Sequence, residues 1–212
     1  MPLFYQHNIN DHARLAVWHI TEPEDFFLQK THLQKEIRHP HKRLQHLAGR
    51  YLLKILHPEF PLHLIEIADS NKPLLPNGSF HFSISHCSDF AAAIISENES
   101  AGIDVELVTP KIELVKHKFL SSREIDVIKN VSNSNNQLLK INLLTLCWST
   151  KEAVYKWYGT GGVDFKEHIH LNEITVKDTR GSIECIFTKE SIKNLTIYFN
   201  LFGNLCLAWV VG

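Results

Sequence analysis

The chain lacks the cysteine and histidine patterns of disulfide-linked domains and of common zinc-binding proteins. Its 212 residues include only four cysteines, which are widely spaced and form no Cys-x-x-Cys pair. Neither a disulfide framework nor a zinc site built on paired cysteines is therefore expected. Although 14 histidines are present, no His-Glu-x-x-His segment occurs, so the usual helical zinc motif is also excluded.

Long apolar runs and an excess of basic charge are absent as well. The longest apolar run, 90–95, is far too short to cross a bilayer, and the first residues show no signal-peptide pattern. A formal net charge of −1 leaves no overall basic field for nucleic acid or a membrane surface. We therefore expect a cytoplasmic protein that binds neither.

What is present is the composition of an ordinary globular protein. Apolar residues make up 44% and charged residues 21% of the chain, and the length suffices for one large domain or two small ones. Hydrophobic periodicity predicts helices over 44–56, 112–118, 122–130 and 138–158. It predicts strands over 13–20, 62–68, 80–85, 90–96, 101–107, 169–177, 182–188, 195–202 and 205–211.

Local signals add detail to these elements. Thr21 is expected to cap a short helix through Phe26 and Phe27, and Ser121 or Ser122 to cap the helix that starts there. Residues 85–89 are expected to break the strand before them, and the strands between 80 and 107 to form an antiparallel meander. Because helices precede strands in each half, we predict an α+β fold.

This α+β fold would consist of two similar subdomains, 1–107 and 108–212. We expect a pseudo-twofold arrangement in which the active site lies at their interface, where ligand clefts commonly form. Because both halves of the site would come from one chain, we expect a monomer.

The stretch Trp148–Tyr158 combines an acid and a base on one helix face. Glu152 and Lys156 are separated by one helical turn, with Glu first, so they can form a surface ion pair worth about 0.2–0.5 kcal/mol. This stretch alone does not distinguish such a structural ion pair from a catalytic acid and base.

A second acidic pair lies on a predicted strand. Asp104 and Glu106 alternate with Ile103 and Val105, so both carboxylates share one strand face. An exposed edge would tolerate them, and so would a cation between them; oxygen ligands suit Mg²⁺ or Mn²⁺. If Glu152 packs against this face, three carboxylates meet.

Basic and polar residues elsewhere could hold phosphate. Lys72 precedes Pro73 in a predicted loop, Ser85 and His86 follow a strand, and Arg43 and Arg50 lie on the basic side of one helix. Taken singly, Lys72-Pro73 more often forms a turn, a histidine after a strand is more often structural, and a basic helix side is usually a solvated face.

In this order the segments resemble the 4′-phosphopantetheinyl transferase superfamily, specifically its long, single-chain, surfactin-synthetase-activating type. The matching segments are Lys72-Pro73, Phe82–His86, Gly102–Glu106, Lys118–Leu120 with Glu124, Trp148–Ala153 with Lys156, and Gly161–Val163. The resemblance runs from about Arg43 to Val163; outside it only the layout is similar.

The resemblance implies a Mg²⁺-dependent enzyme, with Mn²⁺ as the other possible metal. It would transfer the phosphopantetheine group of coenzyme A to a serine of an apo acyl or peptidyl carrier protein and release adenosine 3′,5′-bisphosphate. The implied metal ligands are Asp104, Glu106 and Glu152. Glu152 would also be the general base, and Lys156 would support the pyrophosphate. Contacts to coenzyme A are implied for Lys72, Pro73, Ser85, His86 and Arg50, with Arg43 or His46 as less certain members.

Two other functions are compatible with the same residues. A non-catalytic relative could bind coenzyme A or a carrier protein, although it would not need the complete set of acids together with Lys156. Another Mg²⁺-dependent phosphoryl enzyme, such as a nucleotide hydrolase, is the third option. The sequence does not identify the carrier; its choice is expected to depend on the surface around 108–136.

Overall fold

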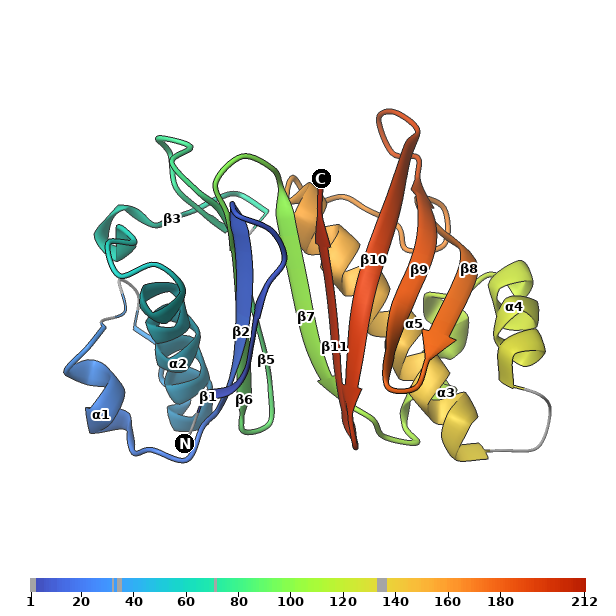
Figure 1. Cartoon of the computed structure of the whole chain (residues 1–212), viewed down its shortest axis with the longest axis horizontal. Helices are drawn as coiled ribbons and strands as arrows, with labels where there is room; N and C mark the ends of the chain where they lie inside the picture. Colours follow the sequence, from blue (N-terminus) through green and yellow to red (C-terminus); the bar gives the residue numbers. More distant parts are fainter. Residues whose placement is uncertain (1–2, 32, 34–35, 71, 133–136) are drawn as a thin grey trace.

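Two antiparallel sheets form the framework of the computed structural model, which describes residues 3–31, 33, 36–70, 72–132 and 137–212 (Figure 1). The first sheet has the order β1-β2-β6-β5 and the second the order β7-β11-β10-β9-β8. The strands of the first are β1 (Leu3–Asn8), β2 (Ala13–His19), β5 (His81–Cys87) and β6 (Phe90–Ser96). Those of the second are β7 (Ala101–Leu107), β8 (Ile169–Lys177), β9 (Arg180–Phe187), β10 (Lys193–Phe202) and β11 (Leu205–Val211). A separate short ribbon pairs β3 (Glu66–Ile67) with β4 (Pro73–Leu74).

One long helix packs on each sheet. α2 (Pro40–Leu56) packs against β2 and β6, and α5 (Gln137–Tyr158) packs against β7 and β11. The shorter helical segments are α1 (Glu24–Leu28), η1 (Leu62–Leu64), α3 (Ile112–Val115), η2 (Lys116–Lys118) and α4 (Ser122–Ser132). Within the described residues, no helix is both long and apolar enough to span a membrane.

Local chemistry fixes the ends of these helices. The side chain of His39 accepts a hydrogen bond from the Lys42 backbone N–H, and Pro40 occupies the first position of α2, where a missing N–H costs nothing. α5 ends before Gly159, whose φ of +79° is a left-handed conformation that glycine adopts without strain.

Three apolar clusters hold the layers together. One lies between α2 and the first sheet, and another lies between α5, α4 and the second sheet. The third joins the two sheets and includes Leu15, Ile94, Ile103 and Leu207, each fully buried. The halves therefore share a continuous interface, as the prediction of an interfacial site requires.

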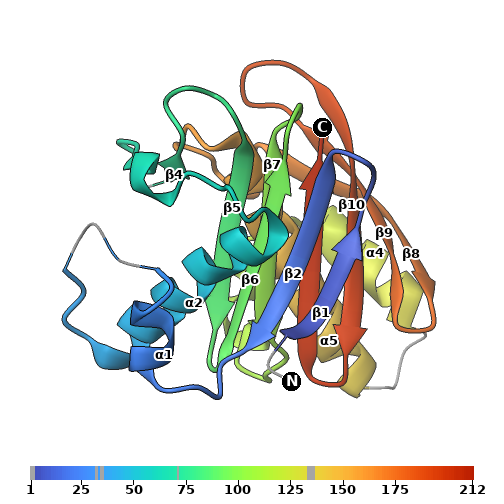
Figure 2. The ribbon, with the colours of Figure 1, turned by 60° about the vertical axis from the view of Figure 1, so that its left-hand side comes forward.

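The two sheets meet where β5 and β7 run side by side (Figure 1, Figure 2). Serine side chains bridge these strands: the Ser83 hydroxyl accepts a hydrogen bond from the Ile103 N–H and the Ser85 hydroxyl from the Val105 N–H, both at 3.3 Å. These contacts satisfy two buried backbone donors on the edge of β7 that faces away from β11.

α5 lies unusually close to β7 at Gly102. A methyl group at Gly102 would overlap the carbonyl oxygen of Ala153 and come within 2.7 Å of the Trp157 nitrogen. Only a residue without a Cβ allows this approach, which brings the last turns of α5 alongside Asp104.

The predicted α+β fold is confirmed, and so are most of its elements. Helices were expected where α2, α4 and α5 lie, and strands where β2, β6, β7, β8, β9, β10 and β11 lie. Ser121 does cap α4, because its hydroxyl accepts from the Glu124 N–H and its own N–H donates to the Glu124 carboxylate. The division of the chain at 107 and 108 stays a prediction.

Other local predictions were wrong. β7 does not continue a meander from β6 but pairs with β11, because its apolar residues are buried between the two sheets. Residues 62–68 hold a 3-10 turn and only two strand residues. Pro23 takes the N-cap position expected for Thr21 and makes no side-chain capping bond. The strand expected to break at Ser85 continues to Cys87. β1, at the edge of the first sheet, was not predicted.

We predict that Gly102→Ala lowers the free energy of unfolding by about 3 kcal/mol, because the added methyl group forces α5 away from β7. Urea denaturation gives this value. Gly203→Ala is the matched control: φ there is +64° with no atoms nearby, so it should cost only about 1 kcal/mol of left-handed strain. Equal losses would contradict a close approach at Gly102.

Candidate active site

Asp104 is the centre around which the site is built. Its carboxylate is 2% exposed and accepts three hydrogen bonds. Oδ1 accepts from the Ser85 hydroxyl at 2.8 Å and from the Lys156 ammonium at 2.6 Å, and Oδ2 accepts from the Ser149 hydroxyl at 2.9 Å. One buried acid thus ties together β7, β5 and α5.

A polar stripe on α5 faces this acid. Ser149, Glu152 and Lys156 follow one another at intervals of about one turn, so they share one helix face. Lys156 also donates to the Ser85 hydroxyl at 2.9 Å. Ser149 was not among the predicted site residues, although its spacing from Glu152 and Lys156 is a signal that could have identified it.

Glu106, two residues after Asp104 on β7, is held by Trp148. The indole N–H donates to Glu106 Oε1 at 3.2 Å. The Trp148 ring packs edge-on against Phe119 and tilted against Phe165, with ring centroids 5.1 and 5.6 Å away. Trp148 therefore serves as a rigid hydrogen-bond donor inside an aromatic cluster.

The acids of the site influence one another's ionisation. Burial, followed by the charges of Asp104 and Glu152, raises the pKa of Glu106 to about 7 against the opposing Trp148 hydrogen bond and Lys156 charge. Burial and the Asp104 charge raise the pKa of Glu152 to about 7, and Lys156 opposes them. Three acids that repel one another at neutral pH form a place that favours a cation.

The fit of a metal ion can be judged from these donors. Within the described part of the chain, no three His, Cys, Asp or Glu side chains are gathered closely enough to hold one. Lys156 supplies the positive charge at Asp104, and Trp148 holds Glu106. The three acids nevertheless offer only carboxylate oxygens, which are the ligands that Mg²⁺ or Mn²⁺ prefers. A bound cation would also relieve the repulsion between them.

A cavity of about 430 Å³ opens beside the acids, a volume typical of ligand sites. Its wall is lined by His46, Arg50, Ile67, Ser70, Lys72, Pro73, Ser83, Ile84, His86, Tyr155, Lys156 and Gly159. Lys156 belongs both to this wall and to the Asp104 cluster, so the cavity and the acids form one continuous site.

Half-buried basic side chains distinguish the cavity. Burial lowers the pKa of Lys72 to about 8. The pKa of His46 falls to about 4 through burial and then through the charges of His86, Arg50 and Lys42. None of the described carboxylates forms an ion pair with Lys72 or Arg50. These groups would gain from an anion such as a phosphate.

The structure brings most, but not all, of the expected ligand contacts to this cavity. Lys72, Pro73, His86 and Arg50 line it. Ser85 instead faces Asp104 and Lys156.

Arg43 lies outside the cavity lining. Its guanidinium donates to both carboxylate oxygens of Glu24, at 2.7 and 2.9 Å, and to the Ile37 carbonyl oxygen at 2.9 Å. The reason is that α1 folds back against α2, which periodicity alone does not reveal.

Ser70, Tyr155 and Gly159 are cavity residues that sequence reasoning missed. The Ser70 hydroxyl donates to the Gly159 carbonyl oxygen at 2.6 Å, so the loop before Lys72 is fastened to the loop after α5. A serine in a polar loop carries no signal of such a long-range contact.

Comparison with protein families matches residues 100–210 to the 4′-phosphopantetheinyl transferase superfamily. A Haemophilus influenzae protein described as a candidate 4′-phosphopantetheinyl transferase is 31% identical over 161 residues, which are 71% of this chain and 65% of that protein. Enterobactin synthase component D of Salmonella typhimurium is 33% identical over 122 residues, 54% of this chain and 47% of that protein. The matches thus span about half to two-thirds of these relatives' length.

We predict that Glu152→Gln stabilises the fold increasingly as the pH rises. In the wild type, unfolded Glu152 loses its proton near its ordinary pKa of 4.5, whereas the folded protein keeps it up to about pH 7, so the free energy of unfolding falls between these values. Glutamine cannot ionise. The advantage of the variant should therefore grow by about 2 kcal/mol between pH 5 and pH 8.

Urea denaturation at the two pH values measures this advantage. Glu66→Gln, at an exposed glutamate, is the control and should show no such growth. A pH-independent effect of Glu152→Gln would contradict the placement of Glu152 among buried acids.

Proposed function

Because this chain belongs to the 4′-phosphopantetheinyl transferase superfamily, we propose that it transfers the phosphopantetheine group of coenzyme A to a serine hydroxyl of an apo acyl or peptidyl carrier protein. The other product is adenosine 3′,5′-bisphosphate. One observation carries the proposal: Asp104, which binds Lys156 and lies close to Glu152, adjoins a cavity lined by half-buried basic side chains. The surfactin-activating subtype stays a prediction, since the relatives named above include enterobactin synthase components.

In this proposal the cavity binds the phosphates of coenzyme A. Lys72, Arg50 and His86 line it without a carboxylate partner among the described residues, so phosphate oxygens can replace the water that these groups would otherwise need. A bound anion would favour the charged forms of Lys72 and His86, whose pKa values burial lowers.

The reaction is a displacement at phosphorus. The serine oxygen attacks the phosphorus that carries the pantetheine arm, and the bond from that phosphorus to the oxygen of the adenosine bisphosphate breaks. Glu152 takes the serine proton, since a carboxylate within hydrogen-bond reach of the hydroxyl, directly or through one water, can act as a general base. Lys156 neutralises charge on the leaving phosphate, and such electrostatic help matters most in phosphoryl transfer.

A divalent cation completes this proposed site. Asp104, Glu106 and Glu152 would hold Mg²⁺ or Mn²⁺, which would supply positive charge to the pyrophosphate oxygens when bound. The carboxylate repulsion described above supports this assignment, because a cation would lower the raised pKa values of Glu106 and Glu152.

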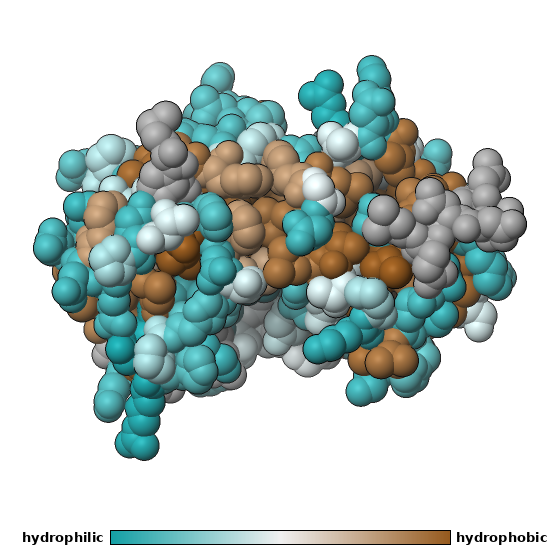
Figure 3. All heavy atoms as spheres, turned by 90° about the horizontal axis from the view of Figure 1, so that it is seen from below, coloured by the Kyte–Doolittle hydropathy of each residue, from teal (hydrophilic) through white to brown (hydrophobic). Residues whose placement is uncertain are grey.

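The carrier protein would dock beside the lower end of β7. Seen from below, apolar side chains form a band across the middle of the molecule (Figure 3). Leu114 in α3, shortly after β7, is 75% exposed, and Lys111 and Lys116 flank it. The exposed Leu114, beside Glu113 and between two lysines in the sequence, suits a partner with a partly apolar face and a polar rim. This surface lies within the predicted range 108–136, of which 133–136 are outside the described residues.

We predict that the protein labels an apo carrier protein when coenzyme A and Mg²⁺ are present, and that Glu152→Gln and Asp104→Asn each slow labelling about 10²–10⁴-fold through loss of the base or the metal ligand. The mass of the carrier gives the result, and Glu66→Gln is the control. Absence of labelling across fatty-acid, polyketide and peptide carriers would contradict the function. Coenzyme A binding without turnover would favour a non-catalytic binder, and phosphate release without a carrier would favour a hydrolase.

A separate prediction concerns the cavity. Lys72→Ala and His86→Ala should raise KM for coenzyme A about tenfold or more with a smaller change in kcat, because each removes a phosphate contact. Steady-state kinetics with a fixed carrier concentration measures this. Lys54→Ala and Arg43→Ala are the controls, at an exposed lysine and at a cation already paired with Glu24. Unchanged KM in both cavity variants would remove Lys72 and His86 from the binding site.

A further inference from the structure

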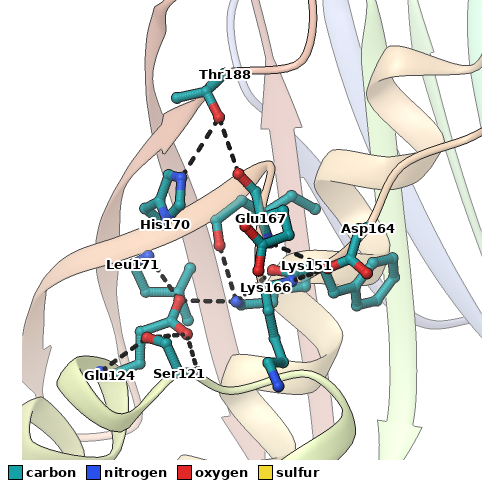
Figure 4. Close-up of polar contacts among 11 residues, drawn as sticks. Ser121, Glu124, Lys151, Asp164, Lys166, Glu167, His170, Leu171 and Thr188 are labelled. Carbon is teal, nitrogen blue, oxygen red and sulfur yellow. Dashed lines mark hydrogen bonds and ion pairs between the residues drawn. The ribbon is translucent and has the colours of Figure 1, made fainter.

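Lys151 in α5 and Glu124 in α4 form a buried ion pair (Figure 4), and Lys151 directly precedes Glu152 in the chain. The two side chains are 0% and 3% exposed, and their charged atoms are 2.7 Å apart. Burying two charges is costly unless each finds further hydrogen-bond partners. The pair therefore requires an explanation beyond general stability.

All the polar capacity of this pair is used. Besides Glu124, the Lys151 ammonium donates to the carbonyl oxygens of Phe165 at 2.7 Å and Ile169 at 2.8 Å. Glu124 Oε1 also accepts from the Leu171 N–H at 3.0 Å. Glu124 Oε2 accepts from the N–H and hydroxyl of Ser121 at 2.8 and 3.0 Å. Each contact has a defined direction, so the network permits one arrangement of its parts.

Those parts come from four segments of the chain. Glu124 is in the first turn of α4, Lys151 is in α5, Leu171 is in β8, and Phe165 belongs to the turn before β8. The turn itself is held by the Asp164 carboxylate, which accepts from the N–H groups two and three residues later. The ammonium of Lys151 thus links α5 to α4, to β8 and to the turn before β8 at one point.

Two aromatic residues next to the network, Phe119 near Ser121 and Phe165, also contact Trp148. Phe119, which is 1% exposed and lies just before Ser121, packs against one part of the Trp148 ring, and the Phe165 ring packs against another. Trp148 in turn donates to Glu106. Lys151 is the residue immediately before Glu152, so a rotation of α5 at Lys151 would move Glu152 and Trp148 together.

We infer that Glu124 and Lys151 are positioning residues that set the rotation and depth of α5, and thereby place Glu152 and Trp148 in the site. This inference rests on the proposed transferase function for its kinetic consequence. An apolar pair of similar volume often stabilises a protein as well as a buried ion pair does. It has no directional contacts, however, and cannot select one placement of the helix.

The experiment compares the wild type with Glu124→Leu/Lys151→Met. We expect a thermal midpoint within a few degrees of the wild type, an unchanged KM for coenzyme A, and a kcat lower by about tenfold or more, because small misplacements of catalytic groups are costly. Amide hydrogen exchange over 148–157 should be faster. The control is Arg14→Gln/Glu97→Gln, which disrupts a partly exposed ion pair of 3.4 Å beside the first sheet, outside the range 108–136; the midpoint, KM, kcat and exchange rate should all stay unchanged.

Glu124→Asp keeps the test decisive if the apolar pair fails to fold. It retains both charges but shortens the link by one methylene, and it should also lower kcat and speed exchange over 148–157. A kcat and an exchange rate like those of the wild type, in whichever of these two variants folds, would overturn the positioning role. If the wild type itself transfers nothing, the proposed function fails, while the exchange measurement still decides the inference.

Discussion

The site depends on the close packing of α5 against β7. At Gly102 the backbone of α5 occupies the space that a side chain would otherwise take. Two residues further along β7, the carboxylate of Asp104 accepts hydrogen bonds from Ser149 and Lys156 of the same helix. A buried carboxylate is tolerated only when its oxygens are satisfied. The helix and the acid therefore depend on each other, and a shift of α5 would remove two of the three hydrogen-bond donors of Asp104, leaving Ser85.

This packing separates charge into two neighbouring regions. Glu106 and Glu152 have pKa values raised to about 7 next to Asp104. Burial lowers the pKa of Lys72, and burial together with neighbouring basic groups lowers the pKa of His46. Lys156 lies between them and contributes to both. A ligand that carries a metal-bridged pyrophosphate would match both regions at once, with its metal toward the acids and its other phosphates toward the cations.

Much of this could be predicted from the sequence, because periodicity and short motifs report local structure. The α+β class, α5 with Glu152 and Lys156 on one face, and the strand with Asp104 and Glu106 all followed from spacing. Contacts between distant segments did not. The pairing of β7 with β11, the Glu24 partner of Arg43 and the Ser70 contact to Gly159 depend on how segments pack in space. Lys151 was recognised only as part of a motif, since burial of a lysine beside Glu124 has no signature in one sequence.

The account is tested most directly by the position of a metal ion. Crystals grown with coenzyme A and Mn²⁺ would be measured near the manganese absorption edge, and the anomalous difference map would locate the ion. We predict one strong peak within coordination distance of Asp104, Glu106, Glu152 and the pyrophosphate, with the nucleotide in the cavity beside Lys72. Coenzyme A bound elsewhere, or manganese at a position that these carboxylates do not reach, would contradict the account.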